Sequence, residues 1–201
     1  MGKGAITRER IVGRAVQLAS TEGINGLTLG RLAESIGMSK SGLFAHFRSK
    51  EELQLQVLQA TIDGFHDQVY LPAAATPSGE ERFRVVYERW VAWEGGHAAM
   101  PGGCLLTQAG VELDDQPGPA RDLLANSRRQ WQDTLTAFAR SAVRAGAFRE
   151  DLDPELFAFQ LESIFLGAHH FSRLLRDERA FTYARAAFEA LLASSRRTPQ
   201  P

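Results

Sequence analysis

The sequence predicts an all-α protein of about nine helices, and three observations carry that prediction. The 201 residues include 28 Ala and 23 Leu but only 9 Val and 6 Ile. Ala and Leu are good helix formers, whereas Val and Ile prefer strands. Apolar residues also recur at helical spacing, for example every three or four residues from Ala120 to Ala142. Capping residues, glycines and prolines separate these periodic segments, as expected for helices joined by turns.

Four helices are expected before residue 71. The first covers about residues 7–22, and Gly23 provides its stop. The second follows Thr28 and the third follows Ser39, since threonine and serine are good N-caps. The fourth starts at Ser49, which forms the capping-box pattern S-x-x-E with Glu52, and extends as a linking helix over residues 51–70.

Longer helices are expected in the rest of the chain. The stretch LPAAATPSG, residues 71–79, has the composition of a linker. Helices then follow over about residues 80–97, 105–113, 120–145, 154–176 and 178–194. Asp153 before Pro154 is a strong helix start, because the carboxylate caps the helix and proline is tolerated in its first turn.

Charge is divided unevenly along the chain. Residues 1–50 carry 8 basic and 3 acidic side chains, a net of +5, and residues 51–201 carry 15 basic and 21 acidic side chains, a net of −6. The basic N-terminal part followed by an acidic remainder indicates that residues 1–50 alone bind a polyanion.

No apolar run approaches the ~18 residues of a membrane span. The single cysteine, Cys104, cannot form an internal disulfide, so a reducing cytoplasm is the expected location.

The most informative segment is residues 28–46, TLGRLAESIGMSKSGLFAH. Two short helices joined by a tight turn at Gly37 have the layout of a helix-turn-helix, whose second helix enters the DNA major groove. Leu43 and Phe47 are expected to anchor that second helix. The small and basic residues Ser39–Gly42 allow its start to approach a duplex closely, and free N–H groups there favour phosphate. The alternatives for this segment are a plain helical hairpin with solvated charges and a helix-turn-helix used for protein contacts.

This part of the sequence resembles the TetR (tetracycline-repressor) family of transcriptional regulators. The match covers about residues 7–58 and includes LTLGRLAESIGMSKSGLFAHFRSKEEL, residues 27–53. Its most specific features are G-x-S, L-F-x-H-F and S-K-E-E-L in this order and spacing. The rest of the chain matches in helical layout. The resemblance implies a three-helix DNA-binding domain over residues 1–50 and a helical effector-binding and dimerisation domain over residues 51–201.

The resemblance also implies particular DNA contacts. Thr28 and Lys50 match phosphate contacts, and His46 matches a histidine beside the phosphate backbone. The start of the recognition helix is expected to face the bases. Where this chain has Phe44 the family often has a tyrosine whose hydroxyl contacts phosphate, so that contact is missing or replaced. Arg31 is a further candidate, and a solvated helix charge explains it equally well. The full expected set is Thr28, Arg31, Ser39, Lys40, Ser41, Gly42, Phe44, His46 and Lys50.

The helix expected over residues 154–176 is apolar on more than one side. A surface helix needs only one apolar stripe. The second stripe indicates that this helix also packs against a partner chain. The alternative is a monomer whose own core is wide enough to cover both stripes. The resemblance implies a homodimer through the last two helices, and a dimer of this kind reads a palindromic operator with half-sites ~34–36 Å apart. The expected interface residues are Phe157, Leu161, Phe165, Ala168, Phe171, Phe181, Ala184, Phe188 and Leu191.

The resemblance further implies a cavity for a small-molecule effector in the C-terminal domain. Aromatic content there fits an apolar or aromatic molecule with a few polar handles. The candidate lining residues are Trp90, Trp93, His97, Cys104, Trp131, Phe138, Phe165 and His169, and ordinary core packing is the alternative for each. The implied function is a ligand-responsive transcriptional regulator, a repressor by family, that the effector releases from DNA.

A helical enzyme or a small-molecule- or metal-binding protein is the alternative function, using Glu94, His97 and Cys104. Glu94-x-x-His97 has the spacing of a di-iron ligand pair, but such a site needs a second pair and two more glutamates. Cys104 as a redox sensor would need exposure and a lowered pKa, and otherwise is a small core residue. The sequence contains no Gly-rich phosphate loop, paired-cysteine zinc pattern or G-x-S-x-G elbow. We therefore expect no enzymatic activity, metal or cofactor.

Overall fold

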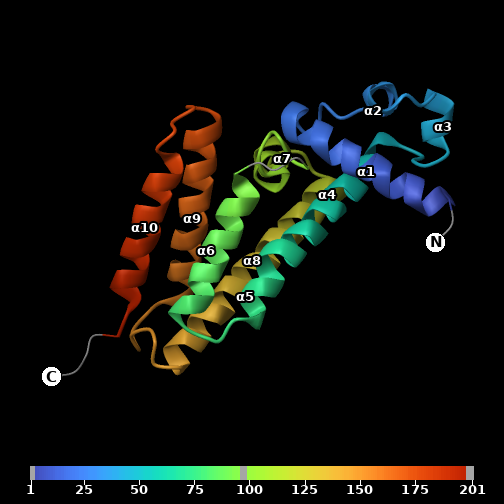
Figure 1. The fold of residues 1–201 in the computed structure, drawn as a ribbon. Coiled ribbons are helices and arrows are strands. Elements are labelled where there is room, and N and C mark those ends of the chain that lie inside the picture. The colour runs from blue at the N-terminus through green and yellow to red at the C-terminus, as the bar shows by residue number, and fades with distance from the viewer. Residues whose placement is uncertain (1–2, 96–98, 198–201) are drawn as a thin grey trace. The chain divides into compact units, whose positions relative to one another are not determined.

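The computed structural model describes the backbone of residues 3–95 and 99–197, and side chains from residue 8. These residues form helices and turns with no named strand, and one isolated bridge joins Phe148 to Arg196. In chain order the helices are α1 (Lys3–Glu22), α2 (Leu29–Ile36), α3 (Lys40–Phe44), α4 (Lys50–Phe65), the π-helical segment η1 (His66–Tyr70), α5 (Leu71–Ala75), α6 (Glu80–Glu94), α7 (Leu105–Leu113), α8 (Pro119–Arg144), α9 (Pro154–Arg173) and α10 (Ala180–Ser195) (Figure 1). None of these helices is long and apolar enough to cross a membrane.

The all-α prediction is confirmed, with one local error. The composition of residues 71–79 predicts a linker, but the helical path continues through η1 into α5, and only the part after Ala75 is a connection. The reason is that Pro72 lies in the first turn of α5, where its missing N–H is harmless, and three alanines follow. Helix α5 is therefore an α-helix of the described residues that the nine predicted helices do not include. Helix α1 also begins at Lys3, earlier than the predicted residue 7.

The chain packs into two units. The first contains Met1–Phe65 and Gly95–Ser127, and the second contains His66–Glu94 and Arg128–Pro201. The boundary after residue 50 that the resemblance implies between the DNA-binding domain and the effector-binding domain stays a prediction. Helix α4 and helix α7 pack in the same unit as α1, α2 and α3.

The core of the first unit is made by one face of each helix. Ala15 and Ala19 of α1 and Leu32 of α2 are buried, as are Leu43 of α3 and Val57 of α4. Helix α1 packs against α2, α4 and α7, and α2 packs against α3. Burial of these apolar faces holds the short helices in place, because a helix of five or eight residues is not stable alone in water.

The core of the second unit is aromatic. Tyr87 and Trp90 of α6 stack on Phe188 of α10 and Phe165 of α9, with ring centroids 4.3 and 3.9 Å apart. Helices α9 and α10 lie side by side, and α6 packs against both (Figure 1). At the other end of this core, Phe83 packs against Phe148 and Phe157 at 5.6 and 4.7 Å between ring centroids.

A charged network closes the outside of the second unit. Glu80 accepts hydrogen bonds from Arg84 at 2.6 Å and from Arg196 at 2.7 Å, and Arg84 also donates to Glu189 at 2.7 Å. The hydrogen bond from Arg196 is the largest of the effects that lower the pKa of Glu80 to about 2; burial opposes it, and the hydrogen bond from Arg84 lowers the pKa further. The network ties the start of α6 to α10 and to the residue that follows it.

Candidate nucleic-acid interface and C-terminal core

The turn between α2 and α3 has the geometry that its sequence predicts. Thr28 caps α2 by accepting a hydrogen bond from the backbone N–H of Arg31 at 3.3 Å. Gly37 ends α2 with φ 66° and ψ 28°, a left-handed conformation that favours glycine. Ser39 then caps α3 by accepting from the N–H of Gly42 at 3.1 Å. The three caps fix where each helix begins or ends.

Helix α3 presents one apolar side to the core and one polar side to solvent. Leu43 and the following Phe47 are fully buried, which confirms their predicted role as anchors. Lys40 and Ser41 are exposed at the helix start. Phe44 is also on the open side, with 53% of its surface exposed.

Three further predicted DNA contacts, Arg31, Lys50 and His46, lie in the same unit, and the charged groups of the first two have partners within the chain. Arg31 forms an ion pair with Glu22 at 3.0 Å. The Lys50 ammonium donates a hydrogen bond to the carbonyl of Asn25 at 2.6 Å, which leaves further donors for a phosphate. His46 is half-buried, with its ring 6.4 Å from that of Phe47.

Of the predicted effector-pocket residues, most lie in one region of the second unit. Trp90 meets Trp131 edge-on at 5.4 Å between ring centroids and stacks on Phe165. His169 lies near the end of α9, and its Nδ1 is 2.9 Å from Oε2 of Glu94 at the end of α6. Trp93 is also buried on α6.

The remaining pocket candidates lie elsewhere or outside the description. Phe138 belongs to a separate cluster, 6.4 Å from Tyr70 and 6.5 Å from Phe83 between ring centroids. Cys104 is buried in the first unit, at the N-cap of α7. His97 lies outside the described residues. Glu94 and Cys104, proposed together in the enzyme alternative, thus belong to different packed units. In the described part of the chain, no group of three or more His, Cys, Asp or Glu residues could hold a metal ion.

Two acidic side chains are largely buried in the second unit. The Glu94 side chain is 1% exposed and its partner His169 is 13% exposed. Glu162 of α9 lies 3.6 Å from Arg128 of α8, and burial raises the pKa of the Glu162 carboxyl although the arginine opposes this. Buried polar pairs of this kind fix a specific arrangement of α6, α8 and α9, because breaking one leaves a costly desolvated group.

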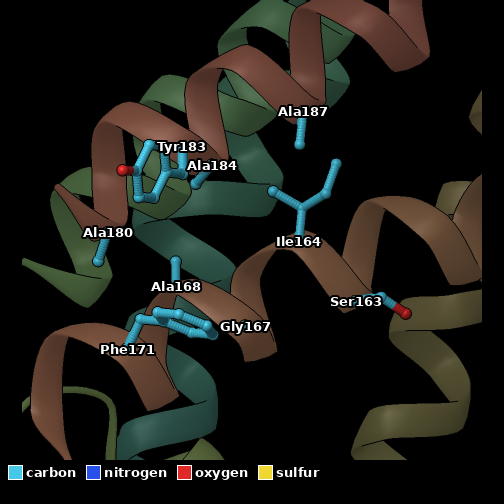
Figure 2. Close-up of a pocket in the computed structure, with 9 residues that line it drawn as sticks. All are labelled: Ser163, Ile164, Gly167, Ala168, Phe171, Ala180, Tyr183, Ala184 and Ala187. Atoms are coloured by element: carbon cyan, nitrogen blue, oxygen red, sulfur yellow. The ribbon is translucent and has the colours of Figure 1, made fainter. Parts of the chain in front are cut away.

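Helices α9 and α10 also carry an open apolar face. Leu156, Phe159 and Leu166 are exposed at spacings of three and seven residues along α9. Between the helices is a groove whose walls are Ser163, Ile164, Gly167, Ala168 and Phe171 from α9 and Ala180, Tyr183, Ala184 and Ala187 from α10 (Figure 2). Figure 2 shows Tyr183 and Phe171 on opposite helices of this groove.

The residues predicted for the dimer interface divide between this face and the core. Phe157, Leu161, Phe165 and Phe188 are at most 1% exposed, because they fill the interior of the single chain. These four residues are therefore core residues of the single chain and not the surface residues that the predicted interface requires. Ala168, Phe171 and Ala184 do line the groove, whereas Leu191 lines a neighbouring hollow with Phe159. Phe181 is half-buried. The exposed Leu156, Phe159 and Leu166 and the buried Phe157, Leu161 and Phe165 both recur at helical spacing, so the sequence carries no signal that separates the exposed face from the core.

In the first unit, α2 packs against α1 and α3, and the polar start of α3 is exposed. This is the arrangement of a DNA-binding helix-turn-helix protein, and the chain continues into a second helical unit. Comparison with known families agrees. The family described as "Bacterial regulatory proteins, tetR family" matches residues 11–57, and "Tetracyclin repressor-like, C-terminal domain" matches residues 79–188. The chain therefore belongs to the TetR family of bacterial regulatory proteins.

Individual relatives match along almost the whole chain. The HTH-type transcriptional repressor DhaR of Mycobacterium sp. (strain GP1) is 25% identical over 191 residues, covering 94% of this chain and 93% of DhaR. The structure of a TetR transcriptional regulator from Chloroflexus aurantiacus J-10-FL has a TM-score of 0.84 at 23% identity, covering 96% of each chain. The structure of AibR in complex with isovaleryl coenzyme A and operator DNA has a TM-score of 0.75 at 19% identity, covering 94% of this chain and 98% of AibR.

The Glu94–His169 pair makes a testable contribution to the stability of the second unit. We expect His169→Ala to lower the free energy of unfolding by about 1–3 kcal/mol, because the buried Glu94 carboxyl loses a hydrogen-bond partner. The adjacent His170→Ala is the matched control, since His170 is exposed, and it should change stability by less than about 0.5 kcal/mol. Urea unfolding followed by circular dichroism measures both. Equal effects of the two substitutions would show that the pair contributes no specific stability.

Proposed function

We propose that this chain is a ligand-responsive repressor that binds a palindromic operator as a homodimer and is released by a small molecule held in its C-terminal region. The observation that carries the proposal is the exposed start of α3, with Lys40 and Ser41, above the buried anchors Leu43 and Phe47. A helix held in this way can enter the major groove without losing its own packing.

The DNA-facing residues have separate roles in this proposal. Ser39, Lys40, Ser41 and Gly42 face the base edges. Thr28, Lys50 and His46 contact phosphates, and Arg31 reaches phosphate if it exchanges its Glu22 partner. Phe44 lacks a hydroxyl for phosphate, so its exposed ring makes apolar contact with sugar or with a thymine methyl group.

Homodimer formation is supported by the open face of α9 and α10. Three large apolar side chains on α9, Leu156, Phe159 and Leu166, are each at least 45% exposed. A second copy of the same face would cover them, and a two-fold dimer brings identical surfaces together. Such a dimer carries two α3 helices, which accounts for a palindromic site.

The effector is proposed to bind near the aromatic core of α6, α8 and α9. Trp90, Trp93, Trp131 and Phe165 supply apolar surface there, and Glu94 and His169 supply polar atoms. This combination suits an apolar or aromatic molecule with one polar group. In this proposal effector binding shifts α4, which is followed directly by η1 along the chain. Coupling between effector and DNA of ~1–3 kcal/mol would be reciprocal.

DNA binding is tested by fluorescence anisotropy with the duplex that precedes the chain's own gene. We expect specific binding that Lys40→Ala and Lys50→Ala each weaken, by about tenfold or more. Lys50→Ala should also reduce the slope of log K against log salt by about 0.9, because one phosphate is no longer neutralised. Arg144→Ala removes the same charge from the second unit and is the control. If both lysine variants bind like the wild type, the assigned interface is wrong.

The dimer surface is tested by placing a charge on it. Phe159→Glu buries a carboxylate in the proposed interface, which costs several kcal/mol of association free energy. We expect the variant to sediment as a single 22.2 kDa chain, whereas the wild type sediments at twice that mass. Leu71→Glu introduces the same charge at an exposed leucine of α5 and should leave the dimer intact. A dimeric Phe159→Glu protein would place the interface elsewhere.

A further inference from the structure

The loop between α1 and α2 is held by side chains from two other helices. The N–H groups of Ile24 and Asn25 donate to the two oxygens of Glu112, each at 3.0 Å. The carbonyl of Ile24 accepts from Gln54 at 3.0 Å, and the carbonyl of Asn25 accepts from Lys50 at 2.6 Å. Four consecutive polar groups of this backbone are thus satisfied by α7 and α4.

The Glu112 carboxylate lies in a space beside the loop that is open because residue 23 is a glycine. A carboxylate that accepts two backbone N–H groups forms charge-assisted hydrogen bonds, which are among the stronger ones in proteins. Gly23 has φ 82°, and a Cβ atom there would lie only 2.6 Å from Oε1 of Glu112. Glycine at this position is therefore needed both for the backbone conformation and for the close approach of the carboxylate.

The segment before α7 makes a second attachment to α1. The N–H of Gly102 donates to the hydroxyl of Ser20 at 3.2 Å in a buried position. A Cβ atom on Gly102 would lie 1.5 Å from the carbonyl oxygen of Ser20, so the two backbones touch directly. Helix α7 and the turn that precedes it are thus fastened to α1 and to the loop that follows it.

The loop between α1 and α2, which Glu112 holds, leads directly to the proposed phosphate contacts. It ends at Thr28, which caps α2. Lys50, another of the proposed phosphate contacts, donates to the carbonyl of Asn25, the residue whose N–H donates to Glu112. The carboxylate on α7 therefore sets the position of the loop against which the Lys50 ammonium is placed.

We propose that Glu112 is a positioning residue for DNA binding, through which α7 controls the setting of Thr28 and Lys50. This inference rests on the proposed function as a DNA-binding repressor. It adds a specific regulatory contact: when α7 withdraws, the N–H groups of Ile24 and Asn25 lose their acceptor and the loop is released. Glu112 itself touches no DNA in this scheme.

The test uses Glu112→Gln, which keeps the shape of the side chain but removes the charge and one acceptor oxygen. Asp115→Asn is the control, because it removes the same charge three residues later from an exposed position. With the full-length chain and the duplex preceding its own gene, we expect Glu112→Gln to weaken binding about tenfold. In the DNA-free protein, amide hydrogen exchange at Ile24 and Asn25 should be faster in Glu112→Gln than in the wild type.

A double-mutant cycle separates positioning from a loss of stability. If Glu112 acts through Lys50, most of the effect of Glu112→Gln should disappear in the Lys50→Ala background, and the salt slope of Glu112→Gln should approach that of Lys50→Ala. A variant that is merely less stable would show additive effects and a wild-type slope. Additivity, wild-type affinity of Glu112→Gln or an equal loss in Asp115→Asn would overturn the proposal. Absence of DNA binding by the wild type would overturn the proposed function, and this inference with it.

Discussion

The proposed recognition helix α3 is five residues long, and burial of Leu43 and Phe47 holds it in place. A helix of this length has no independent stability, because the cost of nucleation exceeds what one turn returns. Its position therefore depends on the core formed by α1, α2 and α4. The caps at Ser39 and Gly37 add direction to that support, since they fix the residue at which the polar start of α3 meets solvent.

The same constraint explains why a distant helix belongs to the DNA-binding unit. Helix α7 packs against α1 and α4, and Glu112 and Gly102 provide the contacts that fasten α7 and the turn before it to α1 and the loop that follows α1. A small domain of short helices buries little surface, so additional attachments matter for its precision. In a regulator, an attachment that comes from a later part of the chain also offers a point of control.

Much of the DNA-binding unit could be predicted from sequence because its signals are local. Thr28, Gly37 and Ser39 mark helix ends through hydrogen bonds or turns that span three or four residues, and helical spacing predicts the burial of Leu43 and Phe47. The hydrogen bonds between Glu112 and the loop after α1 could not be predicted in this way, because Glu112 lies 87 residues from Asn25 and has no local signal for such a contact. In the second unit, the spacing of apolar residues identified the helices but did not separate core from open face. Phe157 and Phe159 are two residues apart, yet one is buried and the other is 64% exposed.

The most direct test of the account is selection of binding sites from a pool of random duplex DNA by the full-length protein. A dimer that presents two supported α3 helices should enrich an inverted repeat, with half-site centres about one helical turn apart, ~34–36 Å. Recovery of such a repeat would support both the assigned recognition helix and the two-fold arrangement. Enrichment of a single unrepeated site would contradict the two-fold arrangement, and no enrichment would contradict the assignment of α3 as the sequence-reading element.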